Sequence, residues 1–366
     1  MTHGLPDTVT VTPLHGIPEV EEGDDLADVI GAGLAATGMS LADGDVVVVS
    51  SKIASKSRGL VTQDPDRDRV IARETEHVVA ERALDDRVAR VVRAKAGPVM
   101  AAAGVDGSNT GARGGLLLLP HDPDAVCREL HGALTERHGV RLAVVLSDTA
   151  GRPWRVGQVD FALGAHGLRV LDDLRGSHDL DGRPLEVTAR AVADEIAAAA
   201  DLVKGKVRAV PVAVVRGLAG LVPDDPGPAP LGARDLVRTG PQDWFGLGRV
   251  EAVRAALGIE PGSADAARVG IPRQRPETRV ERVSRAVSVA VHGMEGATAD
   301  VGPTRVTLGA DTAYDLGVLA SRLEAALWCE WLRAVIEPPG AGRLTVTVGI
   351  HERPLLAGTS HGAGQD

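Results

Sequence analysis

Aromatic residues are scarce in this chain of 366 residues, at 2% of the composition, so its core has to be built from aliphatic side chains. Cysteine is scarce too. Cys127 and Cys329 lie far apart, which argues against a disulfide framework and favours reduced thiols. The opening residues, MTHGLPDTVTVTPL, lack the basic and apolar segments of a secretory signal, and no window approaches the ~20 apolar residues of a membrane helix. These absences predict a soluble cytoplasmic protein.

The charge balance narrows the class of partner. The formal net charge is −10, which argues against nucleic acid or an anionic membrane as the ligand. An anionic small molecule remains a possible ligand, because a local cluster of arginines or a bound metal can outweigh the negative net charge of the chain. The length favours two domains, and the 44% of hydrophobic residues suffice for a buried core.

Two kinds of hydrophobic pattern alternate along the chain. Apolar β-branched runs at 45–50 (DVVVVS), 142–146 (LAVVL) and 209–215 (AVPVAVV) predict buried strands. Helical spacing occurs at 24–36 and at 188–205, where Thr188 is the expected N-cap. The mixture predicts an α+β (mixed α/β) fold.

A Gly- and Pro-rich stretch at 221–235 predicts a linker. We therefore expect one domain at residues 1–240 and a smaller α/β unit at residues 245–356, followed by a disordered tail at residues 357–366. Within the second unit, 304–310 and 343–350 are predicted strands, and 312–336 is predicted to be one long amphipathic helix.

Two glycine-rich loops carry candidate metal ligands. Asp106 lies in AAAGVDGSNTG, and Asp148 lies in SDTAGRPWRVGQVD directly after the predicted strand at 142–146. Carboxylates among small residues can approach a hard cation such as Mg²⁺ or Mn²⁺. The alternative is that both are turn residues, because Asp beside Gly is common in turns.

A basic loop, SSKIASKSRG, follows the first predicted strand. Two hydroxyls, one of them that of Ser51, and the cations Lys52, Lys56 and Arg58 suit phosphate oxygens. The loop lacks the P-loop pattern, and a solvated basic loop is the alternative. No Rossmann fingerprint, nucleophile elbow or zinc-ligand spacing occurs, and His166 and His178 are interpreted as ordinary polar residues.

Taken together, these stretches resemble the coenzyme F420-0:L-glutamate ligase (F420 gamma-glutamyl ligase) family. The resemblance rests on GIPEVEEGDDLADVI, GDVVVVSSKIASKSRG, AGVDGSN, LLLLPHDPD, SDTAGRPWRVGQVDFALGAHGL, VADEIAAAADLVKGK and PVAVVRG, which occur in the family's order over about residues 10–220. The second unit lies outside the resemblance, and we assign it no chemistry.

The resemblance implies a reaction, its cofactors and a set of site residues. GTP would activate a carboxylate of coenzyme F420-0 as an acyl phosphate, and L-glutamate would capture it as an amide, with further γ-glutamyl additions open. The implied cation is Mg²⁺ or Mn²⁺, with K⁺ as a further candidate, and the implied assembly is a homodimer. The implied metal ligands are Asp106, Asp148 and Thr149, and the implied GTP contacts are Ile17, Pro18, Glu19, Val20, Ser51, Lys56 and Asn109.

Arg152, Arg155 and Gln158 lie beside the predicted metal loop, and we interpret them as candidate contacts to anions or substrate. Arg152 and Arg155 are counted with Asp106 and Asp148 as candidate catalytic residues. Two positions depart from the family pattern: Arg58 stands where the family has an acid, and Val159 replaces a threonine. The alternative functions are a metal-dependent nucleotide phosphohydrolase and a non-catalytic nucleotide- or deazaflavin-binding protein.

Overall fold

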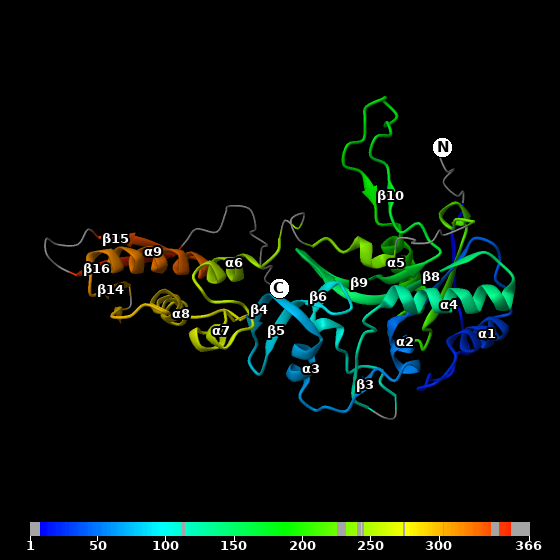
Figure 1. Cartoon of the computed structure of the whole chain (residues 1–366), viewed down its shortest axis with the longest axis horizontal. Coiled ribbons are helices and arrows are strands. Elements are labelled where there is room, and N and C mark those ends of the chain that lie inside the picture. Colours follow the sequence, from blue (N-terminus) through cyan, green and yellow to red (C-terminus); the bar gives the residue numbers. More distant parts are fainter. Residues whose placement is uncertain are drawn as a thin grey trace, which may run out of the picture. The chain divides into compact units, whose positions relative to one another are not determined.

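The computed structural model describes residues 8–111, 114–224, 232–239, 243, 245–273, 275–302, 304–337 and 344–352. The predicted disordered tail at 357–366 lies outside these ranges, as does part of the linker predicted at 221–235. The chain divides into two compact units, which we call the larger unit (residues 1–77 and 92–243) and the smaller unit (residues 78–91 and 244–366; Figure 1).

A five-stranded mixed sheet forms the centre of the larger unit, in the order β1-β12-β2-β8-β9. Its strands are β1 (Thr10–Pro13), β2 (Asp45–Ser50), β8 (Leu142–Arg152), β9 (Arg155–His166) and β12 (Val212–Arg216). β2 and β8 run parallel, and the other neighbours in this sheet are antiparallel. The three predicted strands are therefore the three central ones.

Helices cover both faces of this sheet, which explains why its central strands are apolar throughout. Helix α5 (Val192–Lys204) buries Ile196 and Ala197 against Val46, Val48 and neighbouring residues of one face. Helix α4 (Pro123–His138) packs on β8 and β9, and α1 (Leu26–Thr37) packs on α4. The N-cap predicted at Thr188 is wrong. Helix α5 begins at Val192, because the preceding residues pair as strand β11 (Ala189–Arg190).

The starting positions of these helices are fixed by the residues that precede them. The side chain of Asp25 accepts hydrogen bonds from two backbone N–H groups at the start of α1, and that of Asp122 accepts one, from the Ala125 N–H, at the start of α4. Helix α2 (Ser51–Ser57) follows β2 without a loop, so its first residues emerge at the end of a central strand.

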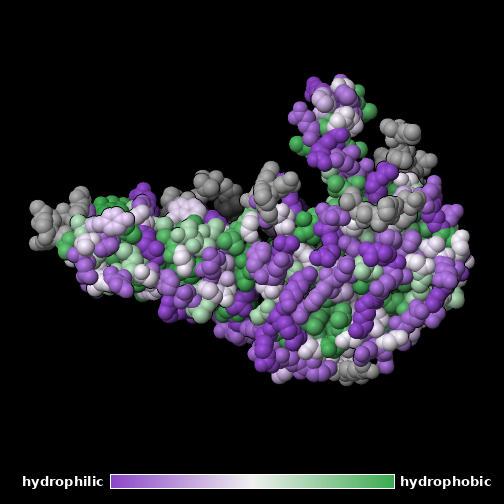
Figure 2. Space-filling model, in the orientation of Figure 1, coloured by the Kyte–Doolittle hydropathy of each residue, from purple (hydrophilic) through white to green (hydrophobic). Residues whose placement is uncertain are grey.

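Short elements complete the larger unit. β3 (Val61–Thr62) pairs with β7 (Leu116–Leu117), and α3 (Arg67–Glu74) follows β3. A further sheet has the order β4-β5-β6, and its residues 78–91 belong to the smaller unit. Its strands are β4 (Thr75–Ala83), β5 (Val88–Ala94) and β6 (Val99–Ala101). β10 (Asp172–Asp173) and β11 begin an arm that projects from the larger unit in Figure 1. In Figure 2, green hydrophobic residues occur among the purple ones on this arm, where Leu180 and Val187 are exposed.

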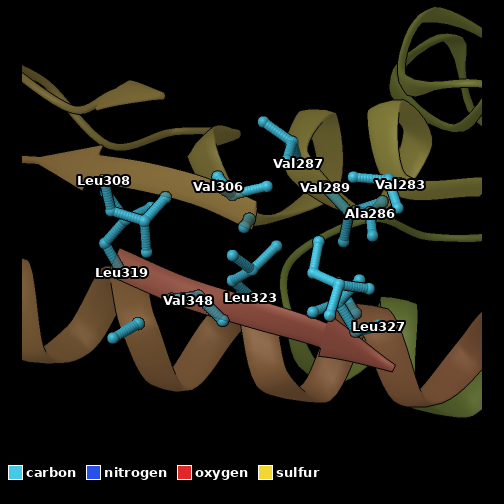
Figure 3. Packing of buried hydrophobic residues seen from close by; sticks show 14 of the residues in the cluster. Val283, Ala286, Val287, Val289, Val306, Leu308, Leu319, Leu323, Leu327 and Val348 are labelled. Atoms are coloured by element: carbon cyan, nitrogen blue, oxygen red, sulfur yellow. The ribbon is translucent and has the colours of Figure 1, made fainter. Parts of the chain in front are cut away.

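The smaller unit contains an antiparallel sheet in the order β13-β14-β16-β15. The strands are β13 (Thr298–Val301), β14 (Arg305–Gly309), β15 (Leu332–Ile336) and β16 (Thr345–Glu352), and the helices are α6 (Arg249–Ala256), α7 (Ala264–Val269), α8 (Arg279–Val291) and α9 (Ala313–Cys329). Figure 3 shows Leu319, Leu323 and Leu327 of α9 within its aliphatic core.

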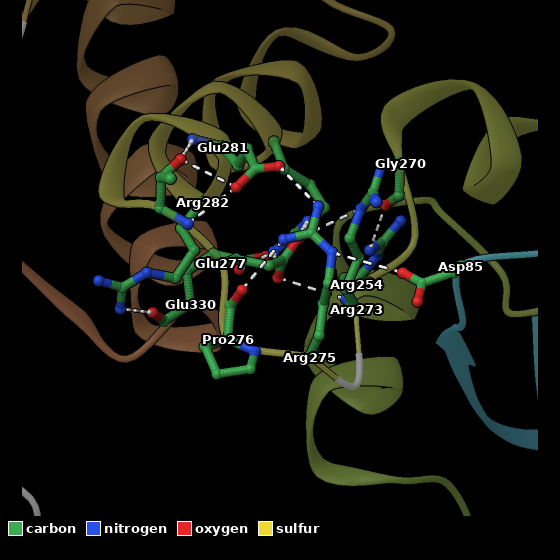
Figure 4. A network of polar contacts seen from close by, with 12 residues as sticks. Asp85, Arg254, Gly270, Arg273, Arg275, Pro276, Glu277, Glu281, Arg282 and Glu330 are labelled. Carbon is green, nitrogen blue, oxygen red and sulfur yellow. Dashed lines mark hydrogen bonds and ion pairs between the residues drawn. The ribbon is translucent and has the colours of Figure 1, made fainter.

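Buried ion pairs tie the smaller unit together. The guanidinium of Arg285 contacts the carboxylates of Glu277 and Glu330, and all three side chains are at most 7% exposed. Figure 4 shows the surrounding network, in which Arg275 reaches Asp85 and Glu281. The group has a net charge of −1, but both buried carboxylates have the Arg285 guanidinium in direct contact, so neither lacks a cationic partner.

The prediction of one long helix at 312–336 is wrong for the residues after Cys329. Helix α9 ends at Cys329, and Trp331 adopts a left-handed backbone with φ 58°, which turns the chain into β15. The residues that follow include the β-branched Val335 and Ile336, which favour a strand. The expected α+β class is confirmed by the helices and sheets of both units. Among the described residues, no helix has the length and apolar character needed to cross a membrane.

Candidate functional site

A pocket of about 440 Å³, lined by both charged and apolar residues, opens in the larger unit, where β2, β8 and the chain after α5 end. Most of the predicted GTP contacts line it, although they come from three separate segments: Ile17, Pro18, Glu19, Val20, Lys56 and Asn109. Asp148 and Thr149, predicted to hold metal, also line it. The pocket therefore brings together most of the residues that the family resemblance implied.

The two predicted metal-binding aspartates meet the same helix start. Ser51 Oγ donates a hydrogen bond to Asp148 Oδ1 at 3.0 Å. The next residue, Lys52, places its Nζ 2.6 Å from Asp106 Oδ2. Consecutive residues of α2 thus contact two carboxylates that are far apart in the sequence, and Ser51 reaches the site through Asp148.

Asp148 is a buried carboxyl with an unusual environment. Burial raises its pKa to about 6, and the nearby charge of Asp160 acts in the same direction, whereas the bonds from Ser51 and the Thr149 N–H oppose the rise. The hydrogen bonds and ion pairs of the described residues give its carboxylate no cationic partner in direct contact. Asp148 is therefore a negative group that would gain from a cation beside it.

Asp160 shows the opposite behaviour a short distance away. Its Oδ2 accepts hydrogen bonds from Lys204 Nζ and Ser147 Oγ, each at 3.0 Å, and its Oδ1 accepts one from Thr149 Oγ1 at 2.5 Å. Although burial alone would raise its pKa, the Lys204 ammonium and these donors hold it below the usual range. Asp160 therefore stays ionised and is already paired.

Sequence analysis missed four pocket residues that carry charge: Asp160, Asp201, Lys204 and Lys206. Lys206 donates a hydrogen bond to the hydroxyl of Thr149, a predicted metal ligand. A signal was available, since GQVD and ADLVKGK both belong to the stretches that resemble the family. Membership of these motifs is therefore the feature of the sequence that could have identified these side chains.

Elsewhere in the pocket lining, Lys56 forms an ion pair with Glu19, and its side chain is 10% exposed. This burial argues against a freely solvated loop at Lys56. Asn109 has a left-handed backbone with φ 53°, a conformation that Asn tolerates better than most residues. At Gly111 (φ +73°), an added Cβ would lie 2.8 Å from Glu19 Oε1, so glycine lets this loop approach the segment that carries Glu19.

Three candidates lie outside the pocket. Arg152, Arg155 and Gln158 are exposed residues at the turn between β8 and β9, where Arg152 pairs with Arg155 across the hairpin. They therefore do not line the pocket that contains Asp148. Asp106 is also absent from the pocket wall and reaches it through Lys52.

The two departures from the family pattern also lie away from the pocket wall. Arg58 forms an ion pair with Glu129 at 2.5 Å, and the half-buried Val159 faces Ala150 in the β8–β9 ladder. Of the two histidines, His166 packs edge-on against His131, and His178 lies on the exposed arm.

The three predicted metal ligands offer oxygen atoms that suit a hard cation, but two of them are paired with lysines. Carboxylate and hydroxyl oxygens are the ligands that Mg²⁺ and Mn²⁺ prefer, and Asp148 supplies a carboxylate without an ion pair. Asp106 would have to release Lys52, and Thr149 would have to release Lys206. In the described part of the chain, no group of three or more His, Cys, Asp or Glu side chains is arranged to hold a metal.

Comparison with known proteins identifies the family. The profile of the F420-0:Gamma-glutamyl ligase family matches residues 16–217, which carry the pocket. Coenzyme F420:L-glutamate ligase of Archaeoglobus fulgidus is 40% identical over 225 residues, covering 57% of this chain and 88% of the relative. The enzyme of the same name from Methanopyrus kandleri is 37% identical over 262 residues, covering 66% of this chain and 99% of the relative. The chain therefore belongs to the F420-0:gamma-glutamyl ligase family.

Proposed function

We propose that this protein joins L-glutamate to coenzyme F420-0 by an amide bond at the expense of GTP, and that it works as a cytoplasmic homodimer. The observation that carries the proposal is the buried carboxylate of Asp148 in a pocket that also holds Lys52, Lys56, Lys204 and Lys206. A pocket with several ammonium groups suits phosphates and carboxylates, even though the whole chain is acidic.

The proposed reaction has two steps. A carboxylate oxygen of F420-0 attacks the γ-phosphorus of GTP, the bond to the β-phosphate oxygen breaks, and GDP leaves. The glutamate amine then attacks the acyl carbon, phosphate departs with its bonding electrons, and the nitrogen loses a proton to give the amide. A second glutamate could be joined in the same way through the γ-carboxylate of the first.

Each group of the pocket has a proposed part in this reaction. Lys56, with Ile17, Pro18, Glu19, Val20, Ser51 and Asn109, would hold GTP, because ammonium and amide groups bind phosphate oxygens. Asp148, with Thr149 and Asp106, would hold Mg²⁺ or Mn²⁺, and K⁺ is a candidate for a second cation position. When bound, the cation would reduce the repulsion between triphosphate and carboxylate. Lys204 would fix Asp160 and thereby the hydroxyls of Ser147 and Thr149.

Mass spectrometry of coenzyme F420-0 after incubation with the protein, GTP, L-glutamate and Mn²⁺ or Mg²⁺ tests this function. We expect mass increments of whole glutamyl units, with one GDP formed for each. GDP release without glutamate or F420-0 would instead identify the nucleotide phosphohydrolase. Tight binding of nucleotide or deazaflavin without any turnover would identify the non-catalytic binding protein.

A further inference from the structure

One carboxylate of the pocket has no part in the proposed reaction steps. Asp201 lies in the last turn of α5 and lines the pocket together with Lys204 and Lys206. Its side chain is half-buried, and within the described part of the chain no hydrogen bond or ion pair reaches its carboxylate. In this respect it differs from Asp160, which is paired with Lys204. Asp201 can therefore accept a cation that enters the pocket.

The two lysines near Asp201 bond to other partners. Lys204 Nζ lies 3.0 Å from Asp160 Oδ2, although Asp201 and Lys204 are three residues apart and are neighbours on the helix surface. Lys206 donates a hydrogen bond to the hydroxyl of Thr149. Both lysines act on Asp201 only through their charge, without direct contact. The pocket thus keeps a negative group beside positive ones without pairing them.

The end of α5 is an unfavourable place for a carboxylate and a favourable place for a bound cation. The C-terminal end of a helix carries partial negative charge, and Asp201 lies in this last turn, where its own C=O accepts a bond from the Gly205 N–H. Burial raises the pKa of Asp201, and the nearby charge of Asp160 acts in the same direction, whereas the charges of Lys204 and Lys206 oppose the rise. An ammonium ion beside Asp201 would be stabilised by both the carboxylate and the helix end.

The proposed reaction requires such a contact. L-glutamate is a zwitterion at neutral pH, so its amine is protonated and cannot attack the acyl phosphate until it loses a proton. The groups assigned so far hold GTP and the divalent cation, and none of them receives this proton. The inference that follows rests on the proposed ligase function and concerns the glutamate side of the same pocket.

We propose that Asp201 binds the ammonium group of the incoming L-glutamate and accepts the proton that the amine must lose before it attacks. Lys206, which is exposed on the segment after α5, binds a carboxylate of the same glutamate. A carboxylate and an ammonium group close together match the two charges of an amino acid. Asp201 is then the general base of the second step.

Atoms and charges balance in this step. The ammonium group gives one proton to a carboxylate oxygen of Asp201, and the lone pair of the nitrogen forms the bond to the acyl carbon. The bond from this carbon to the phosphate oxygen breaks, and its electron pair leaves with phosphate, which takes the second proton that the nitrogen loses. Asp201 then returns its proton to water. Its raised pKa makes Asp201 a stronger base than an ordinary aspartate.

Hydroxylamine separates the removal of a proton from the chemistry of the acyl phosphate. Its nitrogen is largely unprotonated at neutral pH, and it attacks acyl phosphates to give hydroxamates without the help of a base. The Asp201→Asn variant of the full chain is therefore incubated with GTP, coenzyme F420-0, Mn²⁺ and either L-glutamate or hydroxylamine. Mass spectrometry measures the glutamyl product and the hydroxamate.

The two amines should respond differently to this variant. We expect kcat for glutamyl transfer to fall about 100-fold, as for a lost general base, whereas hydroxamate formation stays within about 3-fold of the wild type. The loss should shrink as the pH rises, because more of the glutamate is then unprotonated, while the charges that act on this position, Asp160, Lys204 and Lys206, are all retained. Glu195→Gln is the matched control, since it removes a carboxylate from the first turn of the same helix, outside the pocket lining, and should change neither product.

The outcomes distinguish the role of Asp201 from the function of the protein. Equal loss of both products in Asp201→Asn would overturn the role of Asp201, since a merely structural carboxylate affects all amines alike. Unchanged glutamyl transfer by this variant would overturn it too. Asp201→Glu keeps a carboxylate and should lose less glutamyl transfer than Asp201→Asn. A wild-type protein that forms neither product would instead refute the ligase function, and with it the inference.

Discussion

Lys204 Nζ lies 3.0 Å from Asp160 Oδ2, and both side chains are almost fully buried, at 4% and 5% exposure. Ser147 Oγ contacts both groups, at 2.6 Å from the ammonium and 3.0 Å from the carboxylate. The pair keeps Asp160 ionised next to Asp148, whose own pKa is raised. The charge of Asp160 thus adds to the effect of burial, which is the main cause of the raised pKa of Asp148.

Lys204→Met should destabilise the protein strongly, because it leaves Asp160 buried without its cation. Breaking a buried pair costs about 3–5 kcal/mol of unfolding free energy, measurable by urea denaturation at pH 7. Lys206→Met is the control, since Lys206 is exposed and should cost within about 0.5 kcal/mol. The folded pKa of Asp160 is depressed, so the pair's contribution is complete above the unfolded pKa of about 4 and fades at lower pH. Similar losses from both lysine variants would refute the role of this pair.

Asp148 should make stability depend on pH in the opposite direction. Its folded pKa is raised to about 6, so the folded state holds the proton more tightly than the unfolded chain. Stability from this group is then greatest below the unfolded pKa and decreases as the pH rises through 6. In metal-free buffer, Asp148→Asn should therefore raise the melting temperature at pH 8 more than at pH 5. A constant difference across this range would show that Asp148 has an ordinary pKa.

Asp106→Asn separates the metal interpretation from the turn interpretation. Asp106 accepts hydrogen bonds from the Ser108 N–H at 2.8 Å and the Ser108 hydroxyl at 2.9 Å, as a turn residue would. As a metal ligand, its loss should reduce ligation about 100-fold, with partial rescue by excess Mn²⁺. Ser108→Ala weakens the same turn and keeps the carboxylate. If Ser108→Ala lowers glutamyl transfer as much as Asp106→Asn does, Asp106 only shapes the loop.

Much of this site was accessible from the sequence because it lies at strand ends. The runs at 45–50 and 142–146 became β2 and β8, and their parallel pairing brings Ser51 and Asp148 into contact. The roles of Lys204 and Asp160 in the pocket were harder to predict. Both lie next to apolar stretches, and only the folded chain shows that α5 ends against β9.

The smaller unit was less predictable for a different reason. The apolar pattern at 312–336 continues without a break, and helix and strand both accommodate its last residues. The left-handed backbone of Trp331 decides the change from α9 to β15, and such a conformation has no signal in a residue other than Gly or Asn. The hairpin of residues 78–91 joins the unit formed by the distant C-terminal part through tertiary contacts such as that of Glu81 with Gly262.

Lys56→Ala should weaken the binding of GTP more than the binding of glutamate. The Lys56 ammonium is paired with Glu19 at the pocket wall, so it is positioned to exchange that carboxylate for a phosphate. We expect the KM for GTP to rise about 10-fold or more, with a much smaller change in the KM for glutamate. Glu19→Gln keeps the ammonium and removes its competitor, so its KM for GTP should not rise in the same way. Equal changes for both substrates in Lys56→Ala would exclude a specific phosphate contact.

Arg152 and Arg155 can be tested without disturbing the fold, because both side chains are exposed at the β8–β9 turn. Between them Trp154 is 83% exposed and has a left-handed backbone with φ 56°, a conformation that costs free energy and is frequent at functional sites. The double variant Arg152→Ser/Arg155→Ser should melt like the wild type. If the hairpin contacts F420-0, its KM should rise about 10-fold, since each guanidinium can bind a carboxylate or phosphate through two bonds. Arg175→Ser, on the exposed arm, is the control for a general loss of positive charge. A KM for F420-0 that matches this control would remove Arg152 and Arg155 from the site, whereas a selective rise would show that the bound substrate extends from the pocket to the β8–β9 turn.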